Sequence, residues 1–408
     1  DDFIRTSEAR HYEAVQTIWK KMEAAGDIYL DGNSLGALPH GVMERLERAV
    51  TKEWGQGLIR SWNDADWYPA PQRAGAAIAR LIGAEADEVI VCDSISVNLF
   101  KLLMGALRMR KDRKVIVSEI GNFPTDVYIN AEVAEIMGCE LRCVEPENVE
   151  QAIDEAGEDL ALVQLTHIHY KAGRIYDMAG ITQRAQALGG LVIWDLAHSA
   201  GAVPVDLAGC EADFAVGCTY KYLNGGPGAP AFIYVRPDHA KTVRPALSGW
   251  LGHVAPFAFD MAYNPAPDVS RMRVGTPPVI QMTVLEEAMK AWDGIEMADI
   301  RARSIELCEQ FIAGVEASCP MLELASPRDA QNRGSQVSFK CADGYAVMQA
   351  LITRGVIGDF RAPDVIRFGF TPLYLDEADV EAGINILADI MENRLWDVAE
   401  YKKRQAVT

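Results

Sequence analysis

The clearest chemical signal in the sequence is a lysine placed directly after an apolar run. Lys221 follows the run Phe214–Cys218, and the glycines 225, 226 and 228 form a turn behind it. The carboxyl ends of parallel strands open into a ligand crevice, and a lysine in such a place can react as a free amine and form a Schiff base. Taken alone, the position of Lys221 is also compatible with a solvated lysine at the start of a loop that has no catalytic role.

An aspartate in a similar position strengthens that interpretation. Asp195 ends a second apolar run, Leu191–Trp194, and His198 lies one helical turn further on. Pyridoxal phosphate withdraws electrons only while its ring nitrogen is protonated, and a buried carboxylate keeps that proton in place. Asp195 suits this role, and His198 could pack beside the ring. An aspartate after a strand is often only a helix cap, so it becomes informative through its combination with Lys221.

A third segment could hold the phosphate of such a cofactor. Ser94–Asn98 leads from an apolar run into a helical pattern and carries the hydroxyls of Ser94 and Ser96. Backbone N–H groups in the first turn of a helix bind anions. Either serine could instead be a plain N-cap. The sequence contains no Walker lysine and no GxGxxG motif, which disfavours a nucleotide ligand.

Composition narrows the class of protein. The 408 residues are 49% hydrophobic and 24% charged, with a formal net charge of −19. Such an acidic surface argues against nucleic acid and anionic membranes, and no apolar run has the length of a membrane span or of a signal-peptide core. Several of the eight cysteines lie inside apolar runs, which favours the reducing cytoplasm. Cys139 and Cys143 have the spacing of half a zinc site without a second pair, so we predict no metal.

Strand-like and helix-like segments alternate through the middle of the chain, which predicts an α/β fold with a mostly parallel sheet flanked by helices. We expect a large cofactor-binding domain over residues 30–277 and a smaller α/β domain over 278–408, joined by an N-terminal helix within 1–29. The expected helices are Ser7–Ala25, Pro39–Trp54, Val97–Leu107 and Ile181–Leu188. The expected strands are Val89–Cys92, Val115–Val117, Leu141–Val144, Leu160–Leu165, Leu191–Trp194, Phe214–Cys218 and Phe232–Val235.

The pairs Asp195-x-x-His198 and Tyr220-Lys221, with the segment Leu30–Gly36, resemble the fold-type I pyridoxal-phosphate enzymes, which share the aspartate aminotransferase fold. Within this class the chain is most similar to the kynureninases. The motifs that carry the closer likeness extend over nearly the whole chain; they are Phe123-Pro-Thr-Asp126, Leu165–Gly173, Gly249-Trp250 and Val365–Tyr374.

The resemblance implies a hydrolase that cleaves the Cβ–Cγ bond of L-kynurenine to anthranilate and L-alanine in tryptophan degradation, with pyridoxal 5'-phosphate as cofactor. It also implies a homodimer in which Trp250 and Thr276 contact the phosphate in the neighbouring subunit. Animal members carry asparagine where this chain has Thr276. This difference favours kynurenine over 3-hydroxykynurenine as the substrate.

The resemblance also assigns roles to individual residues. Lys221 would hold the cofactor covalently, and Tyr220 would touch the phosphate and relay protons. Asp195 would face the pyridine nitrogen with His198 beside it. Arg367 would clamp the carboxylate of the substrate, with Ser34 as a second substrate contact. The remaining cofactor contacts would be Ile95 and Ser96 at the phosphate, Phe123 stacked on the ring, and the polar residues Asp126 and Thr166.

Other functions remain open on the sequence. A cysteine desulfurase or an aminotransferase would use the same cofactor, and Cys341 is the loop-like thiol that a desulfurase could use. A metal hydrolase could use His167 and His169, which have metal-ligand spacing. A non-catalytic binding protein on an enzyme fold would not need Asp195 and Lys221. An aromatic substrate pocket could be formed by Trp54, Trp62, Trp67 and Tyr68.

Overall fold

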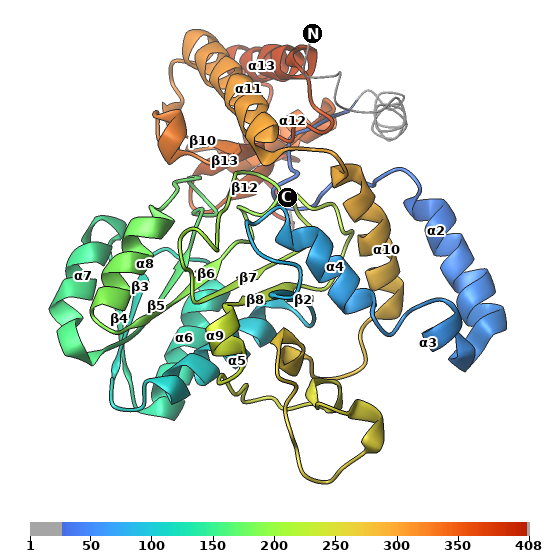
Figure 1. The fold of residues 1–408 in the computed structure, drawn as a ribbon. Coiled ribbons are helices and arrows are strands. Elements are labelled where there is room, and N and C mark those ends of the chain that lie inside the picture. The colour runs from blue at the N-terminus through green and yellow to red at the C-terminus, as the bar shows by residue number, and fades with distance from the viewer. Residues whose placement is uncertain (1–26, 406–408) are drawn as a thin grey trace.

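A seven-stranded sheet forms the centre of the larger of two lobes in the computed structural model, which describes residues 27–405 (Figure 1). The strand order is β2-β8-β7-β6-β5-β3-β4, and β8 alone runs antiparallel to its two neighbours. All seven predicted strands are confirmed. Their bounds are β2 Val89–Val91, β3 Val115–Glu119, β4 Glu140–Val144, β5 Leu160–Thr166, β6 Leu191–Asp195, β7 Phe214–Gly217 and β8 Phe232–Val235.

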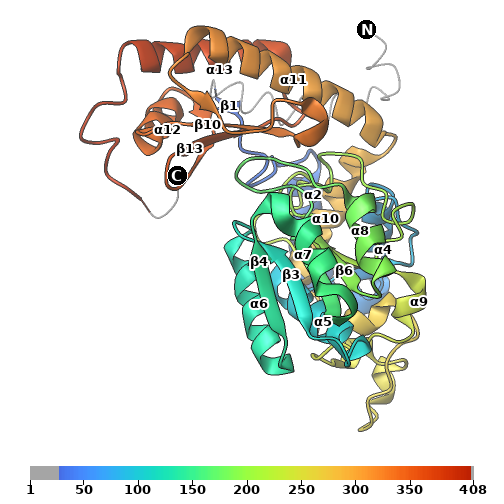
Figure 2. The same cartoon turned by 90° about the vertical axis from the view of Figure 1, so that its left-hand side faces the viewer.

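The sheet is covered by helices on both faces, which explains why its strands are apolar at successive residues. In β6, Leu191 and Ile193 pack with α5 and α6, while Val192 and Trp194 pack in the core of the opposite face. Figure 2 shows α5 and α6 beside the sheet edge that carries β3 and β4. The helices of this lobe are α3 Ser61–Asp64, α4 Ala70–Ala79, α5 Ile95–Met109, α6 Pro124–Met137, α7 Val149–Ala156, α8 Met178–Ala187 and α9 Pro237–Ala240.

Short polar residues set where the helices begin. The Ser94 hydroxyl accepts a hydrogen bond from the Val97 N–H at 3.4 Å and caps α5. The Asp177 carboxylate caps α8 by accepting from the Gly180 N–H at 3.0 Å. Each cap satisfies an N–H group that has no partner inside its helix. The two helices therefore begin close to the positions that the sequence predicts.

The helix predicted over Pro39–Trp54 is shorter in the structure. Regular α2 spans Val42–Arg48, and the chain continues as a wider π-helical stretch over Ala49–Gly57. Gly41 precedes α2 with φ +83°, a left-handed conformation that favours glycine and starts the helix after Pro39. The helix predicted over Ser7–Ala25 lies outside the described residues.

The smaller lobe is built on an antiparallel sheet with strand order β12-β13-β10-β9 (Figure 1). Phe311 of α11 packs against Phe339 and Phe368 of this sheet and forms the centre of the lobe's core. The short strand β1 Ile28–Tyr29 pairs in parallel with β11 Val356–Ile357. The other elements are α11 Met297–Ser318, β9 Glu323–Leu324, β10 Gln336–Lys340, α12 Gly344–Thr353, β12 Asp359–Arg361, β13 Val365–Gly369 and α13 Glu377–Glu392.

The helix α10, Val279–Met289, lies between the lobes in sequence but packs with the larger one. Its Met282, Leu285 and Met289 belong to the same hydrophobic cluster as the central sheet, together with Trp292. The division at residues 277 and 278 stays a prediction. Because α10 shares the core of the larger lobe, we propose that the smaller domain begins near the start of α11.

Candidate active site

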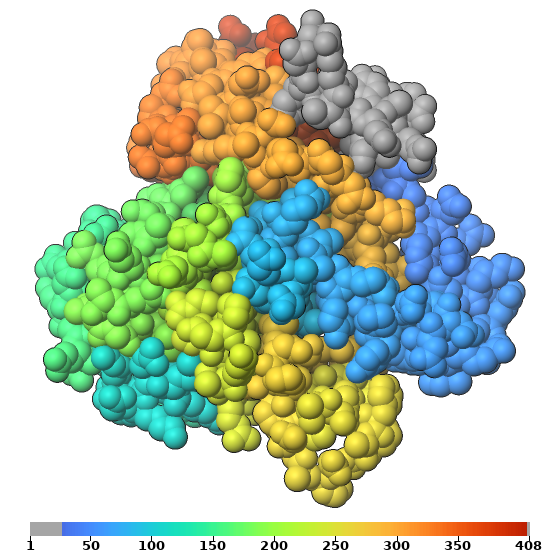
Figure 3. Space-filling view, viewed as in Figure 1, coloured from blue at the N-terminus to red at the C-terminus, as the bar shows by residue number. Residues whose placement is uncertain are grey.

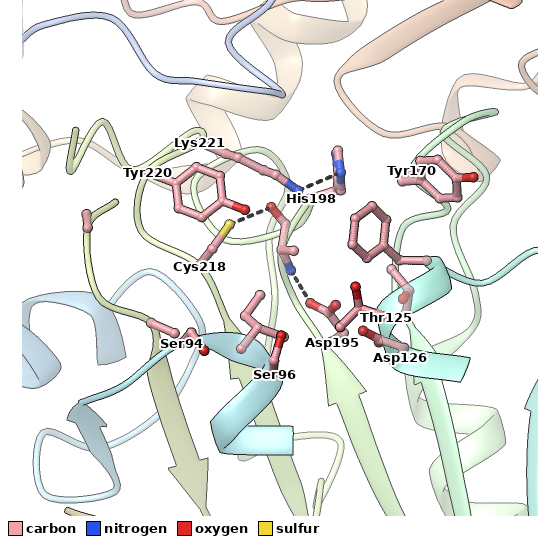
Figure 4. Close-up of a pocket in the computed structure, with 16 residues that line it drawn as sticks. Ser94, Ser96, Thr125, Asp126, Tyr170, Asp195, His198, Cys218, Tyr220 and Lys221 are labelled. Carbon is pink, nitrogen blue, oxygen red and sulfur yellow. Dashed lines mark hydrogen bonds between the residues drawn. The ribbon is translucent and has the colours of Figure 1, made fainter. Parts of the chain in front are cut away.

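A cavity of about 150 Å³ opens where β5, β6 and β7 end and α5 begins (Figure 4). Parallel pairing aligns Thr166 with Asp195 and Asp195 with Val216, so the residues that follow these strands meet at one edge. The sequence-predicted residues that line the cavity are Ser94, Ile95, Ser96, Phe123, Asp126, Thr166, Asp195, His198, Tyr220 and Lys221. The cavity is also lined by Thr125, Tyr170, Ala197, Cys218, Ala229 and Ala231.

Lys221 and His198 form the upper wall of the cavity (Figure 4). The Lys221 Nζ lies 2.9 Å from the Nε2 of His198. Burial, and then the charge of Lys221, hold the pKa of the His198 imidazole well below its usual value. The ring is therefore neutral at physiological pH, and its Nε2 accepts from the lysine. His198 thus directs the Lys221 amine over the cavity.

Two buried carboxyl groups form the floor. Asp195 accepts from the Ala197 N–H at 2.6 Å, and Asp126 accepts from the Gln164 amide at 2.9 Å. Burial raises the pKa of both carboxyls, and the charge of Asp195 raises that of Asp126 further. The Ala197 N–H, the charge of Lys221 and a hydrogen bond from Asp126 all oppose the rise in the pKa of Asp195, so Asp195 is the more acidic of the two.

The floor fits the protonated ring nitrogen of pyridoxal phosphate. Asp195 is 2% exposed, and among the described residues the Oδ1 atom of Asp126 is buried without a hydrogen-bond partner. A buried anion next to an unpartnered oxygen needs a positive hydrogen-bond donor to offset its desolvation. A pyridinium N–H supplies both the charge and the donor.

A buried amide network fixes the side of the cavity that carries Thr166 and Phe123. Asn122 Oδ1 accepts from the Thr166 hydroxyl at 2.5 Å and from the Phe123 N–H at 2.7 Å. The Asn122 amide donates to Gln164 at 3.2 Å, and Gln164 in turn holds Asp126. Phe123 is 42% exposed, and its ring lies perpendicular to that of Tyr170 with the centroids 5.3 Å apart. Because Phe123 lines the cavity, its ring can contact an aromatic cofactor ring.

The opposite end of the cavity fits a phosphate. Ser94, Ile95 and Ser96 lie at the N-terminus of the 15-residue helix α5, where backbone N–H groups and the positive end of the helix dipole face the cavity (Figure 4). Tyr220 lines the same space. The neighbouring Cys218 and burial raise the pKa of its phenol, so the hydroxyl stays protonated and can donate.

Arg367 and Ser34 lie together beside the cavity, in contact with one of its lining residues. Arg367 Nη1 donates to the backbone carbonyl of Tyr170, and Nη2 donates to the Ser34 hydroxyl at 2.8 Å. Asp359 accepts from the Nε and Nη2 of the same guanidinium. The sequence reasoning missed Asp359 and its neighbour Arg361. Asp359 and Arg361 are two residues apart, so on a strand their side chains point to the same face. This spacing could have indicated a pair of interacting charges.

Several residues that the sequence singled out lie outside the cavity. Trp250 and Thr276 do not line it; Trp250 is 39% exposed and packs on Phe257 and Phe259. His167 and His169 bond instead to Ser199 and the Gly121 carbonyl, and no group of three potential metal ligands occurs among residues 27–405. The aromatic residues that do not line the cavity are Trp54, Trp62, Trp67 and Tyr68.

The fold is that of the fold-type I pyridoxal-phosphate enzymes. A cysteine desulfurase from Thermococcus onnurineus NA1 superposes with a TM-score of 0.78 at 19% identity, covering 90% of this chain and 96% of that one. The desulfurase CsdA from Escherichia coli gives 0.76 at 16% identity, covering 91% and 96%.

Sequence comparison assigns the family. Kynureninases of Burkholderia mallei and Burkholderia pseudomallei are 48% identical to this chain over 393 residues, covering 94% of each protein. A kynureninase of Pseudomonas fluorescens is 47% identical, again over 94% of each. A family model described as the kynureninase C-terminal domain matches residues 300–387. The chain belongs to the kynureninase family. The predicted fold class, pyridoxal phosphate cofactor and hydrolytic cleavage of kynurenine are confirmed.

We expect substrate binding to weaken as pH rises through about 7. Burial, and then the charge of Asp359, raise the pKa of Asp31 to about 7, against the lowering effect of Arg367 and Arg361. Ionised Asp31 adds a negative charge beside the arginines, so KM for kynurenine should rise by about tenfold, equivalent to roughly 1.4 kcal/mol. The pH profile of KM checks this. Asp31→Asn should flatten the profile, and an unchanged profile in that variant contradicts the assignment.

The floor of the cavity gives a second prediction. Asp195→Asn keeps the size of the side chain but removes its charge, so kcat should fall by at least about 10²-fold, as for loss of one preorganised electrostatic contact. The thermal unfolding midpoint should stay close to that of the unmodified protein. A large fall in that midpoint, with kcat per folded molecule preserved, would show that Asp195 is a structural residue.

Proposed function

We propose that the cavity is the active site of a cytoplasmic, homodimeric kynureninase in which Lys221 binds the cofactor. The observation that carries this assignment is the meeting of Lys221, His198 and Asp195 at one sheet edge in a chain 48% identical to kynureninases. The reaction adds one water across a carbon–carbon bond. Cγ gains the hydroxyl and becomes the carboxyl of anthranilate, while Cβ gains a hydrogen and becomes the methyl of L-alanine.

Pyridoxal phosphate, when bound, would supply an electron sink for the reaction. The residues of the chain supply proton transfer and orientation. The Lys221 amine, held by His198 at 2.9 Å, is placed to take and return a proton at Cα. The Tyr220 hydroxyl is protonated at neutral pH and lies in the same cavity, so we assign to it the proton delivered to Cβ. Arg367 binds the substrate carboxylate, with Ser34 beside it as a contact of the guanidinium.

Plain kynurenine is the proposed substrate. Thr276 is exposed on the surface of the chain and carries a hydroxyl where animal members carry an amide. Its short side chain reaches less far towards a ring hydroxyl than an asparagine would. The preference for kynurenine over 3-hydroxykynurenine therefore rests on this one position.

A surface loop supports the homodimer. The aromatic loop, residues 250–261, projects from the larger lobe at the lower edge of Figures 1 and 3. It exposes large apolar side chains: Phe257 62%, Phe259 71% and Met261 101%. An exposed cluster of this kind marks a protein interface. A partner seated on this loop would bury it and bring Trp250 towards the neighbouring cavity.

The cytoplasmic assignment rests on the cysteines. All eight are free thiols, and five of them are buried. Buried free thiols suit a reducing compartment. No helix within residues 27–405 has the length and apolarity needed to cross a bilayer.

The desulfurase alternative has little support in the site. A desulfurase needs a reactive thiol that reaches the substrate. Cys341 is 7% exposed at the end of β10, and burial raises the pKa of its thiol to about 11. A protonated, enclosed thiol does not fit that role. The likeness to cysteine desulfurases therefore concerns the fold.

The assignment of Lys221 is tested on the purified enzyme. The protein should be yellow, release fluorescent anthranilate from L-kynurenine and lose its colour on borohydride reduction, because reduction fixes a Schiff base to its lysine. Peptide mapping should recover the label on Lys221. Lys101, which is buried in an ion pair with Asp93, serves as the internal control. Recovery of the label on any lysine other than Lys221 contradicts the assignment.

Subunit exchange tests the shared site. Lys221→Ala and Trp250→Ala homodimers should each be impaired in both sites. After random exchange about half of the dimers are mixed and each has one intact site, so activity should recover to about one quarter of wild-type sites. Native mass measurement first confirms exchange. Absence of any gain over the two parents would show that each site is built within one chain.

A further inference from the structure

A cluster of three charged side chains lies on one face of the small sheet, beside the cavity. Asp359 on β12 stands directly opposite Arg367 on β13 in the antiparallel register. Arg361 lies two residues beyond Asp359 on the same strand and therefore points to the same face. Directly opposed residues of an antiparallel pair have their Cβ atoms about 5 Å apart. The backbone itself thus brings a carboxylate and two guanidinium groups together.

Asp359 forms the centre of the cluster. Its Oδ1 accepts from Arg367 Nε at 3.0 Å, and its Oδ2 accepts from Arg367 Nη2, from Arg361 Nη2 at 2.6 Å and from the Ser34 hydroxyl at 2.8 Å. Asp359 is 2% exposed and Arg367 is 1% exposed, so this two-bond fork lies in a region shielded from water. A fork of this kind fixes both the position and the plane of a guanidinium.

The fork determines which donors remain for a ligand. Arg367 uses Nε and both hydrogens of Nη2 on Asp359 and Ser34, and one hydrogen of Nη1 on the Tyr170 carbonyl. An arginine has five N–H donors, which leaves one on Nη1. Arg367 alone therefore cannot offer a second fork to a substrate carboxylate.

Arg361 supplies the missing donors. Its side chain is 37% exposed, and its Nη2 lies 3.3 Å from the same Ser34 hydroxyl that Arg367 contacts. Its Nε is buried and has no hydrogen-bond partner within residues 27–405. Below the pKa of Asp31, which is about 7, two arginines face the single carboxylate of Asp359, and the excess positive charge matches one further carboxylate.

We propose that Asp359 is a positioning residue that holds Arg367 and Arg361 together as one two-arginine site for the α-carboxylate of the amino-acid substrate. This inference rests on the proposed function, because it needs an amino acid in the cavity. It extends that function by adding Arg361 to the groups that contact the substrate and by giving Asp359 the role of joining the two arginines.

The test compares two ligands on the cofactor-loaded enzyme by calorimetry. L-Alanine carries an α-carboxylate, whereas kynuramine is kynurenine without it. In Asp359→Asn the Kd of L-alanine should rise by at least about tenfold, the effect of losing hydrogen bonds to a charged group. Kynuramine binding should stay unchanged, and KM for kynurenine should rise with little change in kcat. Asp364→Asn, at a carboxylate in the turn between β12 and β13 that has no hydrogen bond to either arginine among the described residues, is the matched control.

Unchanged or tighter L-alanine binding in Asp359→Asn overturns the inference, as does equal weakening of L-alanine and kynuramine, which indicates general loss of structure. Because Asp359→Asn leaves Arg367 buried without its counter-ion and could prevent folding, Arg361→Gln is the second variant. It removes a partly exposed charge, and it should raise the Kd of L-alanine by about threefold or more. Unchanged binding in Arg361→Gln overturns the inference. A wild-type enzyme that binds L-alanine but releases no anthranilate from kynurenine contradicts the proposed function instead.

Discussion

The site depends on the parallel register of β5, β6 and β7. This register places Thr166 beside Asp195 and brings the segment after β7, with Lys221, to the same edge. Successive side chains of a strand point to opposite faces, so a slip of one residue in β6 would turn Asp195 away from the cavity. The apolar residues on both faces of β6 prevent that slip, because each face fills a different helix-covered core. The packing of β6 in these two hydrophobic cores, away from the cavity, therefore fixes where Asp195 lies relative to Lys221.

The second constraint is that each charge removed from water needs a neighbour. Lys221 lies against the neutral His198, Asp195 is stabilised by the Ala197 N–H, and Arg367 is held by Asp359. A buried charge without a partner costs several kcal/mol, so these contacts are required for folding as well as for function. They also fix the protonation states of the groups. Burial lowers the pKa of His198 and keeps its ring neutral, while burial and then the charge of Asp195 raise the pKa of Asp126 and make Asp126 the more basic carboxyl of the cavity floor.

The sequence predicted the central sheet and ten residues that line the cavity, because these depend on local pattern. Strands buried on both faces are continuously apolar, so a polar residue at the carboxyl end of such a strand can be recognised in the sequence alone. The amide network of Asn122 and Gln164 was not predicted, since its members come from different strands and helices. Likewise, the opposition of Asp359 and Arg367 depends on the pairing of β12 with β13. The π-helical continuation of α2 carries no composition signal that separates it from an ordinary helix.

The residues of the proposed site come from both lobes, and this division suggests how one fold can support several reactions. The larger lobe supplies Lys221, Asp195 and the N-terminus of α5, which we propose hold the cofactor. The smaller lobe supplies Arg367, Arg361 and Asp359; we propose that the two arginines contact the substrate and that Asp359 positions them. Cysteine desulfurases share this fold at 19% identity, so the reaction cannot be read from the sheet itself. It must be set by groups around the substrate. In this chain the thiol Cys341 is enclosed in the core of the smaller lobe, while Asp359 and Arg367 lie paired on that lobe's sheet beside the cavity. That arrangement favours an amino acid held by its carboxylate and leaves no nucleophilic sulfur from Cys341 within reach of it.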